Sequence, residues 1–149
     1  GMAELEGSYE PGAWDWVNDQ VAAYERSDGK EADTLQGTDY PIIVVTTRGA
    51  RTGKIRKFGL MRVVHDGEYA LVASKGGMPN NPAWVNNLET YPDDVVIQDG
   101  ADRFGVHVRL VEGDERQVWW ERAVAAYPDY ETYRANTDRH IPVYVATRD

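Results

Sequence analysis

The residues best suited to chemistry are the cations of one glycine-marked segment, residues 40–65. This segment contains no Asp or Glu, although the chain of 149 residues carries a formal net charge of -9. Its basic side chains are those of Arg48, Arg51, Lys54, Arg56, Lys57 and Arg62. An acidic protein that gathers its cations on one turn is expected to hold an anion there, such as a phosphorylated or polycarboxylate cofactor. A solvated hairpin end is the alternative interpretation.

The turn within this segment supplies further groups that suit a phosphate. Thr52 can offer a hydroxyl, and Gly53 allows close approach to backbone N–H groups. Charge-assisted hydrogen bonds would come from three neighbouring cations, Arg51, Arg56 and Lys57. The spacing is not that of a Walker P-loop, because the GxxxxGK[ST] pattern is absent.

A second candidate is the run Ser74-Lys75-Gly76-Gly77, which follows a predicted strand. Adjacent glycines let a flat ring or a phosphate approach the backbone closely. A plain loop turn is the alternative.

A third candidate is a predicted helix that begins at Pro82, with Asn81 as its cap. Trp84, Asn87 and Leu88 lie at i, i+3 and i+4 and therefore share one face of this helix. An Asn beside a Trp could hydrogen-bond a heterocycle, whereas a capped core helix is the simpler interpretation.

A fourth candidate is the series Tyr127, Tyr130 and Tyr133, spaced three apart. If the stretch is helical, these phenols line one side, where they could stack on an aromatic substrate or donate a proton. A core or interface stripe is the alternative, and Pro128 is expected to interrupt the helix.

Several function classes are disfavoured by composition. The chain has no cysteine, and its histidines (His65, His107 and His140) lack metal-ligand spacing, so no metal site is expected. The GxGxxG and G-x-S-x-G patterns are absent. Net acidity argues against nucleic-acid binding, and no apolar run is long enough to span a membrane. We expect a cytoplasmic protein that is at most peripheral to a membrane.

The predicted elements indicate one α+β domain over residues 13–149, preceded by a mobile segment, residues 1–12. A helix is predicted over 13–26, and a capping box at Asp114 and Gln117 is predicted to start another that runs to residue 126. Strands are predicted over residues 42–47, 55–65, 69–74, 94–98, 103–112 and 141–147. Asp66-Gly67 and Asp99-Gly100 are hairpin signals, so the sheet should be mainly antiparallel and barrel-like.

Four short motifs occur in order along the chain: TTRGARTGK at 46–54, ASKGG at 73–77, NPAWVNNL at 81–88 and TDRHIPV at 137–143. Together they resemble the motifs of the deazaflavin-dependent nitroreductase family, also called the A-type F420-dependent oxidoreductases. The resemblance extends from about Trp14 to Val145. It implies a split β-barrel of six mainly antiparallel strands with flanking helices, related to the flavin-binding barrels of pyridoxamine oxidases.

The resemblance also implies a cofactor and a reaction. Reduced coenzyme F420, which carries a deazaflavin ring, a phosphate and a polyglutamate tail, would donate a hydride to a quinone, an enone or a nitroaromatic compound. A source among the actinobacteria, which make this cofactor, would fit.

By the same resemblance, each candidate receives a role. The phosphate and tail would be held by Arg51, Thr52, Gly53, Arg56 and Lys57. The ring would be lined by Leu60, Met61, Ala73, Ser74, Lys75 and Gly76, and buttressed by Trp84, Asn87 and Leu88. The substrate side would be shaped by Tyr127, Tyr130 and Tyr133, and the catalytic proton donor is placed among Tyr130, Ser74 and Tyr133.

The chain departs from the family pattern at several positions. Val85 stands where Tyr is usual, Asn86 where His is frequent, and Arg51 where Lys is common. Phe58-Gly59 replaces Thr-Pro or Asn-Pro. These changes bear on substrate preference more than on cofactor binding.

Two other functions stay open. One is an FMN-dependent reductase on the same barrel, although FMN has no glutamate tail and needs fewer cations. The other is a non-catalytic deazaflavin-binding protein. In either case the partner is a small molecule, and a homodimer is conceivable.

Overall fold

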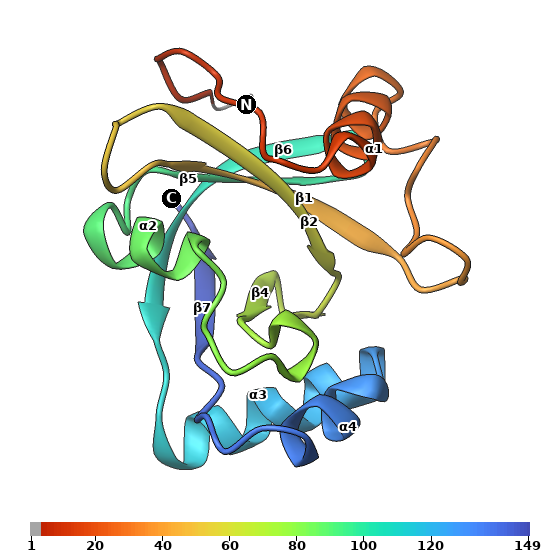
Figure 1. Cartoon of the computed structure of the whole chain (residues 1–149), viewed down its shortest axis with the longest axis vertical. Helices are drawn as coiled ribbons and strands as arrows, with labels where there is room; N and C mark the ends of the chain where they lie inside the picture. Colours follow the sequence, from red (N-terminus) through yellow and green to blue (C-terminus); the bar gives the residue numbers. More distant parts are fainter. Residues whose placement is uncertain (1–3) are drawn as a thin grey trace.

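The fold is built on one curled antiparallel sheet, described over residues 4–149 by a computed structural model of the chain (Figure 1). Seven strands lie in the order β2-β1-β5-β6-β7-β4-β3, and every neighbouring pair is antiparallel. Their bounds are β1 Ile42–Arg48, β2 Ile55–Met61, β3 Val64–His65, β4 Glu68–Val72, β5 Val95–Asp99, β6 Asp102–Leu110 and β7 Val143–Arg148.

The expected six strands become seven because the predicted strand 55–65 is broken. Pairing with β1 ends at Met61, which lies opposite Ile42, and pairing with β4 starts at Val64. The chain thereby passes from one edge of the sheet to the other.

Both predicted hairpins are confirmed. Asp66 and Gly67 have φ angles of 50° and 79° between β3 and β4, which is the geometry of the tight turn that Asp-Gly favours. Asp99 pairs with Asp102 across the second turn, at Gly100.

Strand β1 is buried on both sides, so its alternating side chains enter two different cores. Ile43 and Val45 pack in a cluster with Leu71 and Ile97, inside the curl of the sheet. Ile42 and Val44 belong to the other cluster, which contains Trp120, Tyr130 and Ile141. This second cluster lies under helices and ends at the cavity described below.

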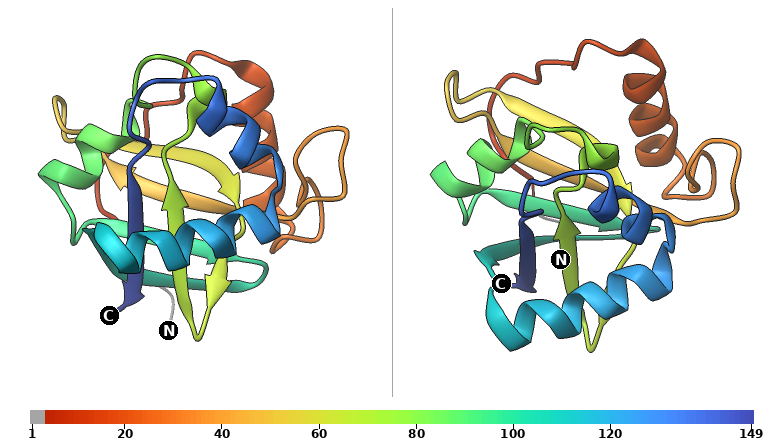
Figure 2. Two further views of the ribbon diagram at one scale, coloured as in Figure 1. Left: turned by 90° about the horizontal axis from the view of Figure 1, so that it is seen from below. Right: turned by 60° about the horizontal axis from the view of Figure 1, so that its bottom comes forward.

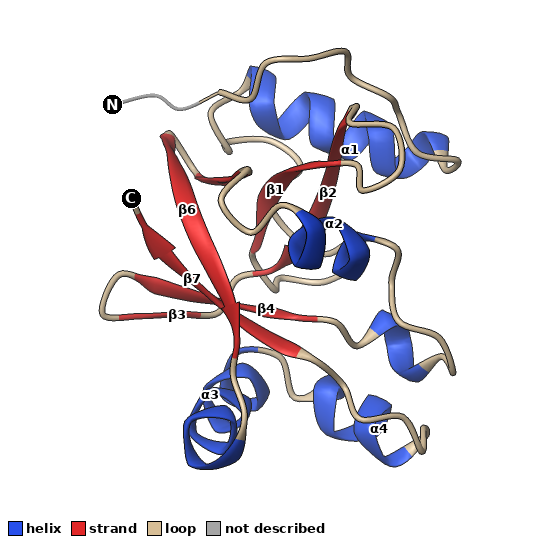
Figure 3. Ribbon diagram, turned by 90° about the vertical axis from the view of Figure 1, so that its left-hand side faces the viewer, coloured by secondary structure: helices blue, strands red, loops and turns tan. Residues whose placement is uncertain are grey.

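Four helices flank the sheet (Figure 3): α1 Asp15–Arg26, α2 Trp84–Thr90, α3 Gly113–Ala126 and α4 Asp129–Ala135. Helix α1 packs on β2, whereas α3 packs on β4 and β7 at the other end of the molecule (Figure 2). None of the described helices has the length and apolar character needed to cross a bilayer.

The predicted helix caps are wrong at two places. Helix α2 begins at Trp84 with Ala83 at the cap position, and Asn81 instead accepts a hydrogen bond from Arg139. Helix α3 follows Glu112, and no side-chain cap forms there, so the box at Asp114 is not made. The predicted interruption near Pro128 is confirmed, because α3 ends at Ala126 and α4 begins at Asp129.

The segment expected to be mobile, residues 1–12, includes residues 1–3, which lie outside the described residues. Further along it, Tyr9 bridges to Ile55 beside β2. The backbone of Ser8 accepts a hydrogen bond from Ile55, and Glu10 donates one to the same residue.

A short 3-10 turn, η1 Lys75–Gly77, connects the sheet to α4 by close backbone contact. Gly77 has a φ of 78°, and a Cβ built on it would lie 2.7 Å from the carbonyl oxygen of Tyr133. A side chain at this position would therefore push η1 away from α4.

We predict that Gly77→Ala lowers the free energy of unfolding by about 2–4 kcal/mol, since it adds a backbone clash to the cost of a left-handed residue. Urea unfolding of Gly67→Ala is the matched control, because Gly67 has a similar φ of 79° with open space around it. The control should lose only about 1 kcal/mol. Equal losses would show that the contact with α4 contributes nothing.

Candidate active site

A cavity of about 300 Å³ lies where β2, the end of β4, η1 and α4 meet. Residues that are far apart in the sequence share its wall: Leu35, Gly59, Leu60, Met61, Val72, Ser74, Lys75, Gly76, Pro82, Trp84, Tyr127, Tyr130 and Tyr133. Most of the expected ring-lining and substrate-side residues are therefore brought together. Ala73 and Leu88, which were assigned to the ring, are instead fully buried in the core inside the sheet.

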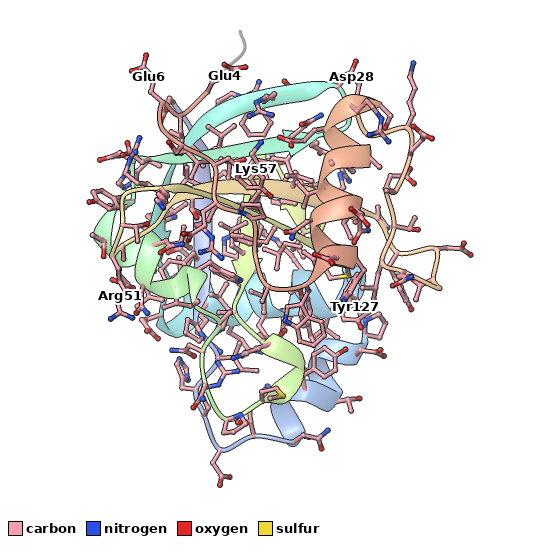
Figure 4. All side chains as sticks on the ribbon, turned by 45° about the horizontal axis from the view of Figure 1, so that its top comes forward. Glu4, Glu6, Asp28, Arg51, Lys57 and Tyr127 are labelled. Atoms are coloured by element: carbon pink, nitrogen blue, oxygen red, sulfur yellow. The ribbon has the colours of Figure 1, made fainter. Side chains whose placement is uncertain are left out.

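A groove of about 590 Å³ adjoins the cavity at Trp84. The β1–β2 turn contributes Gly49 to Thr52, β2 contributes Arg56 to Phe58, and α2 contributes Asn86 and Asn87. Further wall residues come from the N-terminal segment and the start of α1: Glu10, Gly12, Ala13, Trp14 and Val17. Figure 4 shows Arg51 and Tyr127 toward opposite sides of the molecule in that view. A ligand with a flat ring at one end and charges at the other matches this arrangement.

Distant carboxylates neutralise most cations of the basic segment. Their ion pairs are Arg48–Asp94 at 2.9 Å, Lys57–Glu25 at 2.9 Å, Arg62–Asp99 at 2.9 Å, Arg56–Glu10 at 2.5 Å and Lys54–Glu10 at 3.7 Å. The absence of acids from 40–65 therefore did not mean uncompensated charge. Among residues 4–149, Arg51 has no carboxylate partner, and its side chain is exposed on the turn.

Asn87 fixes the turn to helix α2. The Ala50 N–H donates to Asn87 Oδ1 at 2.9 Å, and Asn87 Nδ2 donates to Thr47 Oγ1 at 3.1 Å. This amide therefore positions the turn, and these two hydrogen bonds engage its oxygen and one of its N–H donors within the protein. The Arg51 and Thr52 amides donate to no acceptor within the described residues, so they stay available to an anion.

Arg139 organises the loop that forms one wall of the cavity. Its guanidinium donates to the carbonyl oxygens of Ala73 at 2.9 Å, Ser74 at 2.7 Å and Met78 at 3.1 Å, and to Asn81 Oδ1 at 2.6 Å. Burial lowers the pKa of this guanidinium relative to its ordinary value. The sequence reasoning gave Arg139 only as part of a motif and assigned it no role. Its one signal in the sequence was its place in the TDRHIPV motif, four residues before β7.

The three tyrosines converge although no single helix carries them. Tyr127 lies at the end of α3, and Tyr130 and Tyr133 lie on α4. The hydroxyls of Tyr127 and Tyr133 are 2.8 Å apart and hydrogen-bonded, and the ring of Tyr127 meets that of Tyr130 edge-on. Burial, first among the causes, raises the pKa of both Tyr127 and Tyr130.

The hydroxyls of Tyr130 and Ser74 reach the cavity. Neither has a hydrogen-bond partner among the described residues. Within residues 4–149, the only buried side-chain polar atom without a partner is Arg116 Nε. Although Tyr130 is just 2% exposed and Ser74 7% exposed, both hydroxyl oxygens must therefore meet solvent, and both residues line the cavity.

An aromatic stack separates the cavity from the groove. Phe58 and Trp84 are nearly parallel, with ring centroids 5.0 Å apart and an interplanar angle of 10°. Phe58 is one of the family departures, as is Val85, which turns into the core inside the sheet. Asn86, a third departure, lines the groove.

Comparisons with known proteins show the family to which this chain belongs. A family model for F420H(2)-dependent quinone reductases matches residues 16–148. The F420H(2)-dependent quinone reductase Rv1261c of Mycobacterium tuberculosis is 35% identical over 130 residues, which cover 85% of this chain and 86% of the relative.

Two solved structures are also similar. An F420-H2-dependent reductase, FDR-A, is 46% identical and superposes with a TM-score of 0.68 over 76% of this chain and 99% of that chain. A structure described as a domain-swapped dimer is 42% identical, with a TM-score of 0.71 over 89% of this chain and 98% of that one. The expected split-barrel fold is confirmed, with seven strands. The chain belongs to the F420H(2)-dependent quinone reductase family, and coenzyme F420 is its cofactor.

Proposed function

We propose that the cavity holds the deazaflavin ring of coenzyme F420 against an incoming quinone, while the groove holds the phosphate and the tail. The observation that carries this proposal is that the cavity adjoins, at Trp84, the groove that contains the basic β1–β2 turn. The cofactor thus has room for its apolar ring at one end and charge complementarity at the other.

The residues present fit this group. Gly59 and Gly76 expose bare backbone in the cavity wall, and a Cβ built on Gly76 would meet nothing within 4 Å. In the groove, Arg51 and the free turn amides provide donors for a phosphate. Thr52 and Arg56 extend this anion site, whereas Lys57 is engaged by both oxygens of Glu25 and contributes less.

When bound, the reduced cofactor would supply a hydride, and a quinone that gains this hydride and a proton from solvent water becomes a hydroquinone. Tyr130, Ser74 and Tyr133 orient the quinone oxygen by hydrogen bonds. Because its pKa is raised, the Tyr130 phenol keeps its proton at neutral pH and donates a hydrogen bond; it is not an acid poised to ionise.

Assembly is a further part of the proposal. The similar protein that forms a domain-swapped dimer supports a homodimer for this chain.

Charge reversal at Arg51 should weaken binding of oxidised F420 at least about tenfold, because it replaces a groove cation that has no carboxylate partner within residues 4–149 by a repelling carboxylate. A fluorescence titration of Arg51→Glu measures this, with Lys30→Glu as an equal charge change at an exposed residue outside the groove. Unchanged affinity in Arg51→Glu would place the anion elsewhere. Tighter binding of FMN than of F420 by the unmodified protein would reverse the cofactor assignment.

Tyr130→Phe should lower kcat about tenfold with a soluble quinone, since one hydrogen bond to the developing oxyanion is lost. Tyr91→Phe, remote from the cavity, should leave kcat unchanged. Steady-state kinetics with several quinones decide the assignment. A Tyr130→Phe enzyme that matches the unmodified one with all of them would remove Tyr130 from the reaction.

Arg139→Lys should raise the KM for reduced F420 about tenfold while changing kcat less, because one ammonium cannot bridge the four acceptors that the guanidinium spans. Arg109→Lys, at an exposed ion pair with Glu115, is the control and should behave like the unmodified enzyme. A purely structural role for Arg139 would instead lower the urea midpoint and leave the KM of the folded fraction unaltered.

A further inference from the structure

One wall of the cofactor groove carries a carboxylate that faces its cations. Glu10 lines the groove together with Arg51 and Arg56. Its Oε1 lies 2.5 Å from Arg56 Nη1, and its Oε2 lies 3.7 Å from Lys54 Nζ. The side chains of Glu10 and Arg56 are 37% and 38% exposed, so the ion pair is weak and open to competition by another anion.

Hydrogen bonds to β2 at and before Glu10 and to α1 after it fix the backbone position of Glu10. The Glu10 N–H donates to the Ile55 carbonyl at 2.9 Å, and the Ile55 N–H donates to the Ser8 carbonyl at 2.8 Å. Two residues later, the Gly12 backbone and the Asn18 side-chain amide exchange hydrogen bonds of 3.1 and 2.9 Å. The carboxylate can rotate, but the segment that carries it is tied to β2 and to α1.

The groove is consequently less cationic than its basic side chains suggest. Glu10 pairs with Arg56, and Glu25, in the last turn of α1, pairs with Lys57. Arg51 alone, among the cations that line the groove, lacks a carboxylate partner within residues 4–149. One guanidinium and two amides suffice for a phosphate. The carboxylates of the cofactor's glutamate tail would therefore meet cations that are already paired, together with the negative charge of Glu10.

We propose that Glu10 is a specificity-determining residue that limits how much affinity the γ-glutamate tail of the cofactor adds. This inference rests on the proposed function, since it takes the tail to run along the groove past Arg56. The enzyme then binds long-tailed and tail-free forms of the phosphorylated deazaflavin with similar affinity. The phosphate at Arg51 and the ring in the cavity provide most of the binding.

The test compares two ligands with three proteins. Long-tailed F420 and its tail-free phosphorylated precursor are titrated by deazaflavin fluorescence into the unmodified protein, Glu10→Gln and Glu121→Gln. Glu121 is an exposed residue of α3, outside the groove, so its variant controls for the change in net charge. Urea unfolding of each variant confirms that the fold is retained.

We expect Glu10→Gln to tighten binding of the long-tailed form about fivefold at low salt and to change the tail-free form less than about twofold. The gain should shrink as ionic strength rises, because the groove is open to solvent. Glu121→Gln should match the unmodified protein with both ligands.

Other outcomes would overturn the inference. Equal gains with both ligands would show a general field effect, and weaker binding of both by Glu10→Gln would show that Glu10 only props Arg56. If Glu10→Gln binds both forms normally and the ratio of its affinities for the long-tailed and tail-free forms equals that of the unmodified protein, Glu10 has no role in tail binding. The proposed function would then still stand. Failure of the unmodified protein to bind either deazaflavin overturns the proposed function and this inference with it.

Discussion

The site depends on the way one guanidinium satisfies the backbone of a tightly turned loop. Lys75, Gly76 and Gly77 all have positive φ angles, so this loop turns tightly and cannot continue the ladder of β4. Arg139, which lies near the C-terminal end of the sequence, donates hydrogen bonds to the carbonyl oxygens of Ala73 and Ser74 in this loop. The loop lines the cavity with Ser74, Lys75 and Gly76, follows β4 directly and contacts α4 at Gly77. The Arg139 side chain thus links the end of β4, the loop after η1 and the segment that leads into β7. The position of the cavity wall therefore depends on the position of the segment before β7.

Charge in this protein is balanced across distance. The acidic excess of the chain is not spread evenly, since specific carboxylates on the N-terminal segment, α1 and the β5 region reach the basic segment from outside it. Within the described part of the chain, Arg51 is the cation of the β1–β2 turn that has no carboxylate partner. A groove arranged in this way favours an anion at one place, and the aromatic stack of Phe58 on Trp84 separates that place from the apolar cavity.

Sequence patterns predicted the local features of this fold well, because local chemistry determines them. The two hairpins follow from Asp-Gly turns, and β1 follows from a β-branched run that is buried on both faces. The gathering of Ser74, Trp84 and the tyrosines in one cavity followed from the family resemblance rather than from any local pattern.

Features that depend on contacts between distant segments could not be predicted. Glu10 and Glu25 precede their cationic partners by 46 and 32 positions, and no pattern in the sequence pairs them. Residues 62 and 63, where the strand breaks after Met61, include no Gly or Pro to signal the break. Asn81 has the right residue type for a helix cap, but the guanidinium of Arg139 competes for its oxygen. In each case tertiary structure decided between two reasonable local outcomes.

The most direct test of the account is a crystal structure of the protein with oxidised coenzyme F420 bound. The account predicts the deazaflavin ring against Ser74, Lys75 and Gly76, with the phosphate on the β1–β2 turn at Arg51. A ring bound outside this cavity, or a phosphate held away from Arg51, would contradict it.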